Sequence, residues 1–173
     1  MADIDIPKGI SVEIKQDRII VSGSLGKNER LFNNAILNVK KEGEKISVGT
    51  DTSKRLQKKA SSAAIALAKE IKNDIDGVSK HFEINMESTF AHFPMTLEAK
   101  GDSLIIKNML GERAARTAHI VGDTKIEIKD KKVRVYGIKL DDVTQTAANI
   151  RIAVKIRNKD NRVFQDGVYY SLE

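Results

Sequence analysis

Short runs of alternating hydrophobic and polar residues dominate the first part of the chain. Alternation with a period of two is typical of half-buried β-strands, and turn residues separate the runs closely enough to predict antiparallel hairpins. The predicted strands cover residues 10–14, 18–21, 30–32, 35–39 and 46–48, with a turn at Lys41-Glu42-Gly43-Glu44 before the last of them. A further alternating run at residues 80–86 predicts the strand that ends this part.

The period changes near residue 53, where the pattern predicts a helix. Thr52 or Ser53 can cap its start, and Gly77 follows its expected end. Lysines dominate the opposite face, so this helix is expected to lie on one face of the sheet. The residues that share its apolar stripe are Leu56, Ala60, Ala63, Ala64, Leu67, Ala68 and Ile71.

The second part of the chain repeats the order of elements. Strands are predicted at residues 95–99, 104–107, 125–128 and 133–135, and a helix opens at Asp141-Asp142 and runs to about residue 156. Carboxylates in a first helical turn suit the helix dipole. A polar turn from Asn158 to Gly167 then leads into a final strand at residues 168–170.

A constant spacing relates the two parts. Val12-Glu13 and Leu25-Gly26 return 85 positions later as Leu97-Glu98 and Leu110-Gly111. We therefore predict an α+β fold built by tandem duplication, in which each copy is a small, mainly antiparallel sheet with one helix packed on it. The expected domains are residues 1–88 and residues 89–173, and functional residues are expected where the copies differ.

Composition narrows the possible functions. The chain has 40% hydrophobic and 31% charged residues, which is typical of a soluble globular protein. It has no cysteine, which excludes disulfides and thiolate metal sites. No secretory signal is evident, and the apolar stretch at residues 60–68 is too short to span a bilayer. We expect a cytoplasmic protein without membrane contact that is a monomer when free.

Catalytic signatures do not emerge from the sequence. His81, His92 and His119 lack the spacing of metal ligands, and we find neither phosphate-binding glycine loops nor a nucleophile elbow. Asp141-Asp142 is explained by its place at a helix start. We therefore predict no enzyme activity, no metal site and no cofactor.

The charge balance favours an anionic partner. The net charge is +6, and three arginines lie in the first half of the chain against six in the second. Two basic segments stand out, residues 107–116 and residues 151–162. Lysines and arginines there can neutralise phosphates, although cations also favour helix C-termini without any ligand. Aromatic residues make up only 5%, so recognition of folded RNA by backbone and shape fits better than base stacking.

Several segments of the chain resemble a known family. The sequence is similar to ribosomal protein six of the large subunit, in its archaeal and eukaryotic form, over nearly its whole length. The most specific segment is the turn from Asn158 to Gly167 followed by Val168-Tyr169. The other segments are Ala91-His-Phe-Pro-Met95, Asn108-Met-Leu-Gly-Glu112, Val121-Gly-Asp-Thr-Lys125 and Gln145-Thr-Ala-Ala-Asn-Ile150.

The resemblance implies a function. It implies a structural constituent of the large ribosomal subunit that binds large-subunit rRNA near the sarcin–ricin loop, mainly through the second copy, with neighbouring ribosomal proteins as partners and translation factors nearby. The alternatives are a non-ribosomal protein-interaction module that uses the first copy, or another RNA-binding module. By residue type and position, the RNA-contacting residues are expected to be Lys155, Arg157, Asn158, Lys159, Asn161, Arg162, Gln165 and Gly167, with Arg113 and Arg116 as further candidates.

Overall fold

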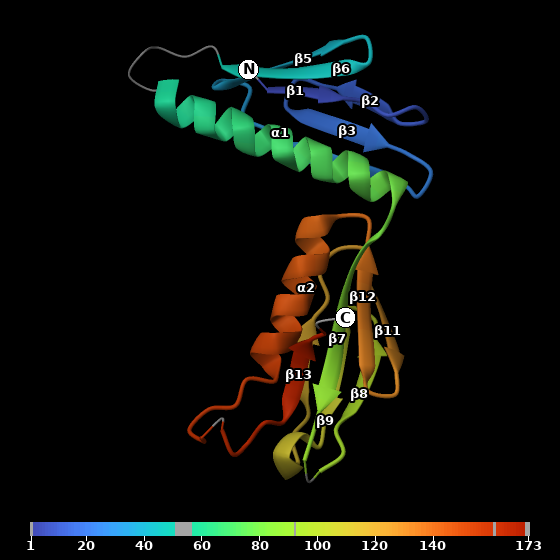
Figure 1. The fold of residues 1–173 in the computed structure, drawn as a ribbon, viewed down its shortest axis with the longest axis vertical. Coiled ribbons are helices and arrows are strands. Elements are labelled where there is room, and N and C mark those ends of the chain that lie inside the picture. Colours follow the sequence, from blue (N-terminus) through green and yellow to red (C-terminus); the bar gives the residue numbers. More distant parts are fainter. Residues whose placement is uncertain (1, 51–56, 92, 161, 172–173) are drawn as a thin grey trace. The chain divides into compact units, whose positions relative to one another are not determined.

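The computed structural model describes residues 2–50, 57–91, 93–160 and 162–171. The chain divides into two compact units, Met1–His81 (unit 1) and Phe82–Glu173 (unit 2). Each unit combines small antiparallel sheets with one helix (Figure 1). The predicted α+β architecture is therefore confirmed. No helix in the described ranges is both long enough and apolar enough to cross a membrane.

Unit 1 contains two three-stranded sheets, with strand orders β1-β6-β5 and β2-β3-β4. The core joins both sheets to α1, and Ile19, Ile46, Val48 and Ile71 are almost completely buried in it. The elements are β1 (Ala2–Asp5), β2 (Ser11–Ile14), β3 (Arg18–Ser22), β4 (Lys27–Leu31), β5 (Leu37–Glu42), β6 (Lys45–Thr50) and α1 (Gln57–Ser79).

The helix α1 buries most of the predicted apolar stripe. Ala60, Ala64, Leu67, Ala68 and Ile71 are buried as expected, whereas Ala63 is exposed. Leu56 and the two candidate caps, Thr52 and Ser53, lie outside the described residues.

The predicted end of α1 at Gly77 is wrong, since the helix continues to Ser79. Val78 is fully buried, and its carbonyl oxygen accepts a hydrogen bond from the Leu25 N–H at 3.2 Å. This contact with the β3–β4 turn requires a close approach: a Cβ at Gly23 would lie 2.7 Å from Val78 Cγ2. Tertiary packing therefore carries the helix past the glycine.

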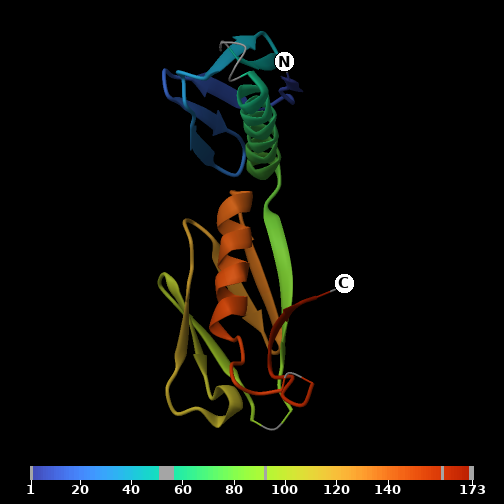
Figure 2. The same ribbon diagram turned by 90° about the vertical axis from the view of Figure 1, so that its left-hand side faces the viewer.

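Unit 2 has a four-stranded sheet, β11-β12-β7-β13, and a three-stranded sheet, β10-β9-β8. The helix α2 packs on both sheets, and Figures 1 and 2 show it lying along the strands of this unit. The elements are β7 (Phe82–Thr89), β8 (Thr96–Lys100), β9 (Ser103–Lys107), the 3-10 turn η1 (Met109–Gly111), β10 (Arg116–His119), β11 (Lys125–Lys129), β12 (Lys132–Gly137), α2 (Leu140–Ala153) and β13 (Gly167–Tyr170).

Strand register supports the duplication residue by residue. Val12 stands opposite Val21 in unit 1, and their counterparts 85 positions later, Leu97 and Ile106, stand opposite each other in unit 2. The second hairpin repeats with an offset of 87: Val39 opposite Val48 becomes Ile126 opposite Val135. The two copies therefore share one topology, with a small insertion between the hairpins.

The strand predicted to end the first copy instead opens the second. The strand β7 pairs with β12 and β13, so it is an inner strand of the unit 2 sheet, and the division falls after His81 rather than after Ser88. Its counterpart is β1, because Ala2 stands opposite Val48 as Ile84 stands opposite Val135. The sequence pattern missed β1, whose alternation rests on two aspartates, a residue that is rare in strands.

Two further elements differ from expectation. The strand β10 begins at Arg116, within a segment interpreted from sequence only as a basic stretch. The helix α2 ends at Ala153 rather than near residue 156, and Ile152 in its last turn is 62% exposed.

Candidate nucleic-acid interface

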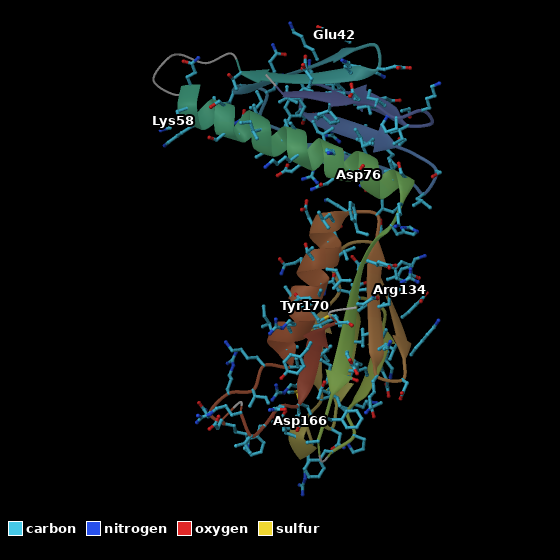
Figure 3. The ribbon with its side chains drawn as sticks, viewed as in Figure 1. Glu42, Lys58, Asp76, Arg134, Asp166 and Tyr170 are labelled. Atoms are coloured by element: carbon cyan, nitrogen blue, oxygen red, sulfur yellow. The ribbon has the colours of Figure 1, made fainter. Side chains whose placement is uncertain are left out.

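The most cationic turn of unit 2 follows α2. The chain leaves α2 after Ala153 and returns to the sheet at β13, with the buried Asp166 at the point of return (Figure 3). The Asp166 carboxylate accepts a hydrogen bond from the Ala91 N–H at 2.6 Å, which anchors this end of the turn. Between these two ends the exposed cations are Lys155, Arg157, Lys159 and Arg162.

Contacts within the turn define its shape. The Asp160 carboxylate accepts hydrogen bonds from the Arg162 N–H at 2.9 Å and from the Arg162 guanidinium at 2.9 Å. The Asp160 carbonyl oxygen accepts from the Phe164 N–H at 2.9 Å, and Gln165 Nε2 donates to the Arg162 carbonyl oxygen at 3.2 Å. Lys159 Nζ lies 4.6 Å from the centre of the Phe164 ring, within the range of a cation–π contact. The described residues of the turn therefore contact one another through both side chains and backbone.

The pair of Asp160 and Arg162 sets the local electrostatics. Hydrogen bonds from Arg162 lower the pKa of the Asp160 carboxyl, and the same contact raises the pKa of Arg162. The carboxylate thus stays ionised and offsets part of the turn's positive charge. The Arg162 side chain is nevertheless 90% exposed, which leaves its outer edge open to another acceptor.

Arg116 has a structural role at the end of α2. Its guanidinium binds the Glu112 carboxylate through two hydrogen bonds of 2.6 and 2.8 Å. The remaining nitrogen donates to the carbonyl oxygens of Ala153 and Lys155 at 3.0 and 3.1 Å. These carbonyls belong to the last turn of α2 and its extension, where no intrahelical donor is available. The arginine expected to contact RNA therefore caps a helix.

The two basic segments found in the sequence are neighbours in unit 2. Arg116 joins them directly through its hydrogen bond to the Lys155 carbonyl oxygen. The pKa of Glu112 is lowered chiefly by its hydrogen bond from Arg116, with a smaller contribution from the nearby charge of Lys159. Arg113, one residue further, is exposed. Arg113 and the turn after α2 thus form one cationic region.

Other arginines of unit 2 bind side chains of the protein itself. Arg134, on the outer face of the sheet, forms an ion pair with Glu83 at 2.5 Å and lies 3.7 Å from Glu127 (Figure 3). The Arg151 guanidinium lies over the Tyr170 ring, 5.2 Å from its centre. The excess of arginine in the second half therefore overstates the charge available to a ligand.

One predicted contact residue lies elsewhere than expected. Gly167 is buried in β13, and a Cβ at this position would lie 3.2 Å from the Tyr169 ring, so the glycine makes room for that ring rather than for a ligand. Asn161 lies outside the described residues. Asn158 is exposed with a left-handed backbone, φ 59°, which asparagine tolerates better than most residues.

Sequence analysis missed two exposed hydrophobic residues at the turn. Val163 is 70% exposed and Phe164 is 38% exposed, beside the cations. The available signal was a pair of apolar residues inside an otherwise polar segment. Their position offers a small apolar surface next to the charged groups.

Comparison with known proteins finds relatives over nearly the whole length of this chain. A family model described as Ribosomal protein L6 matches residues 93–167, which include both basic segments. A large ribosomal subunit protein uL6 from Methanosarcina mazei is 41% identical over 167 residues, covering 96% of this chain and 93% of the relative. The chain belongs to the ribosomal protein L6 family. Relatives of the same name from Methanocella arvoryzae and Staphylothermus marinus are 39% and 42% identical, each across 96% of this chain and covering 93% and 91% of the relative. The resemblance noted in the sequence is thus confirmed.

Proposed function

We propose that this member of the ribosomal protein L6 family is a structural constituent of the large ribosomal subunit that binds large-subunit rRNA mainly through unit 2. The observation that carries the proposal is the turn after α2, on whose described residues Lys155, Arg157, Lys159 and Arg162 are exposed beside a single exposed carboxylate, Asp160, which binds Arg162. The names of the relatives, which place them in the large ribosomal subunit, support it. The protein would accordingly work in the cytoplasm, on the ribosome.

The chemistry of the turn suits an RNA backbone. Each cation that neutralises a phosphate releases counterions, so affinity falls steeply with salt. Gln165 and Asn158, both exposed, can add orienting hydrogen bonds to sugar or phosphate. The hydrogen bonds of Asp160 with Arg162 and Phe164 restrict these residues before binding, which reduces the ordering entropy that opposes it. Arg113 extends the same cationic region.

The family resemblance suggests which RNA. We place the contact at rRNA helices near the sarcin–ricin loop, in the region where translation factors bind, with neighbouring ribosomal proteins beside it. The role is to fix the position of RNA helices, which requires binding and no chemical step.

The test measures binding to an rRNA fragment that contains the sarcin–ricin helix, at several salt concentrations. The double substitution Lys159→Ala and Arg162→Ala should weaken binding by about tenfold or more and reduce the salt slope by about two. The matched control, Lys40→Ala and Lys58→Ala, removes two exposed lysines from unit 1 and the same net charge. Equal losses in the two variants would show that only net charge matters, and an unchanged salt slope in the first would refute the site.

A further inference from the structure

The duplicated sheets differ by one strand. In unit 2, β7 lies between β12 and β13, whereas its counterpart β1 is the edge strand of the order β1-β6-β5. The chain explains the difference: β13 follows α2 after a long turn, while α1 ends at Ser79 and the chain enters β7 at Phe82. Among the described residues, unit 1 therefore has no strand in the place that β13 fills in unit 2.

The outer edge of β1, which pairs with no other described strand, presents the same backbone groups that bind β13 in unit 2. The Ile6 N–H donates to the Glu44 carbonyl oxygen at 2.8 Å, so by antiparallel alternation the N–H and C=O groups of Asp3 and Asp5 point away from β6. Their counterparts on β7 are Asn85 and Glu87. The Ser171 N–H donates to the Asn85 carbonyl oxygen at 2.9 Å, which places these positions on the side of β13.

A groove runs along this edge of β1, between the strand and α1. Its volume is about 500 Å³, and its apolar lining comes from Ile4, Ile65, Ala68 and Ile75. Ile65 is 53% exposed there, an unusual position for a large aliphatic side chain on a helix. In unit 2 the strand in the corresponding place contributes Val168, which is fully buried in the core beside α2.

We propose that unit 1 accepts a fourth strand from another protein, as an extended basic segment that pairs antiparallel with β1. In unit 2, Tyr170 and Val168 lie opposite Met86 and Ser88. In the same register, two residues of the added segment lie opposite Ile4 and Ile6, on the α1 side. These positions require apolar side chains. The residues opposite Asp3 and Asp5 lie on the other face and match the two carboxylates when they are lysine or arginine. Pro7, which has no N–H, limits the ladder at its far end.

The charges in the groove argue against other occupants. Asp3, Asp5 and Asp76 border the groove together with Lys69 and Lys72, and Lys45 lies 3.8 Å from Asp5, so the groove lacks the excess of cations that an RNA backbone requires. A second copy of β1 paired antiparallel would bring Asp3 opposite Asp5, and like charges directly opposite are destabilising. A basic peptide avoids both conflicts.

The experiment uses the full chain and a synthetic hexapeptide with blocked ends, Gly-Val-Lys-Tyr-Lys-Gly, written in the β13 register. Its control, Gly-Val-Tyr-Lys-Lys-Gly, has the same composition, but its two apolar residues are adjacent and fall on opposite faces in every register. Amide hydrogen exchange followed by NMR should show protection of Asp3 and Asp5 with the first peptide at about 1 mM and not with the control. Equal protection by both peptides, or none by either, would overturn the proposal.

Paired variants locate the binding. Ile65→Asp should weaken binding of the first peptide by about tenfold or more, whereas Ile152→Asp, at the exposed isoleucine of α2, should leave it unchanged. Protection of Asp3 and Asp5 without peptide, in a protein that sediments as a dimer, would assign the edge to a second copy. Loss of rRNA-fragment binding in Ile65→Asp would assign the groove to RNA. The substitutions Lys159→Ala and Arg162→Ala leave unit 1 unchanged. A failure of the proposed strand addition is therefore distinguishable from a failure of the proposed RNA site.

Discussion

Unit 1 and unit 2 have the same strand register but secure their helices differently. In unit 1, Arg30 of β4 reaches the buried Asp74 of α1 with two hydrogen bonds of 2.7 and 3.1 Å and also binds Glu70 at 3.1 Å. In unit 2, Arg116 of β10 instead binds the carbonyl oxygens at the end of α2. In both units, an arginine on the last strand of the β2-β3-β4 or β8-β9-β10 sheet therefore stabilises the fold. Where the two copies differ in sequence, the first explanation to consider is therefore a difference in structure, and only then a difference in ligand binding.

The largest effect is expected from Asp74→Ala. The Asp74 side chain is 3% exposed and that of Arg30 is 13% exposed. Of the two carboxylates that bind the buried guanidinium, the substitution leaves only Glu70. Breaking one side of a buried pair costs about 3 kcal/mol. Hydrogen exchange resolved by residue should show the loss in unit 1 and unchanged protection in unit 2.

The control for this experiment is Asp17→Asn, which removes an exposed carboxylate beside Arg18 in the same unit. It should leave the unfolding midpoint unchanged, because exposed ion pairs contribute little. A loss of similar size in both variants would show that Asp74 has no special role.

Val168→Ala should destabilise unit 2 by about 2 kcal/mol, because Val168 is completely buried in its core. Unit 1 should be unaffected, since the core cluster that contains Val168 is made of unit 2 residues. Val163→Ala is the matched control, because the same side chain is 70% exposed in the preceding turn. If urea unfolding gave equal midpoints for the two variants, β13 would not be part of the unit 2 core.

These differences show what the sequence could reveal of the fold. Hydrophobic periodicity located both helices and most strands, because period-two and helical patterns are local. It could not assign β7 to unit 2, since strand pairing with β12 and β13 is non-local. It ended α1 too early at Gly77 because the contact that continues the helix, from Leu25 to Val78, joins residues far apart in the chain.

The sequence could predict which segment forms the candidate site, but it was less able to predict the role of each residue in it. Basic composition and the family resemblance pointed to the turn after α2, where Lys155, Arg157 and Lys159 are indeed exposed. Sequence alone could not separate Arg116 from them, because its role depends on where the last carbonyls of α2 lie. Nor could it show that Gly167 lies under the Tyr169 ring.

Arg116→Ala should separate the helix cap from RNA binding. The substitution removes the hydrogen bonds of the Arg116 guanidinium to Glu112 and to two carbonyl oxygens. The free energy of unfolding of unit 2, measured by heat or urea, should therefore fall by about 1.5 kcal/mol. Arg113→Ala removes a neighbouring exposed arginine without these contacts and should retain full stability. RNA binding measured well below the unfolding temperature should fall more in Arg113→Ala than in Arg116→Ala. A larger loss of RNA binding in Arg116→Ala than in Arg113→Ala would show that Arg116 contacts RNA.

The same pair predicts a pH effect. The pKa of Glu112 is lowered below its ordinary value of 4.5, mainly by the hydrogen bond from Arg116. A carboxyl with a lowered pKa in the folded state stabilises the fold above its unfolded pKa and loses this contribution as the pH falls through the folded value. Below about pH 4.5 the stability difference between wild type and Glu112→Gln should therefore shrink. A difference that stays constant into that range would contradict the assigned pair.

The smallest effect on stability is expected from Asp160→Asn, in the turn itself. Asp160 is exposed, so the unfolding midpoint should not change, but the hydrogen bonds that orient Arg162 weaken. Asp123→Asn, at another exposed position of unit 2, raises the net charge by the same amount. If charge alone governs rRNA affinity, both variants should bind the fragment more tightly, and equally. Because Asp160 also holds the turn in shape, we expect Asp160→Asn to gain less than Asp123→Asn, with faster hydrogen exchange at the Arg162 amide. Equal gains in the two variants would mean that the turn contributes charge and no defined geometry.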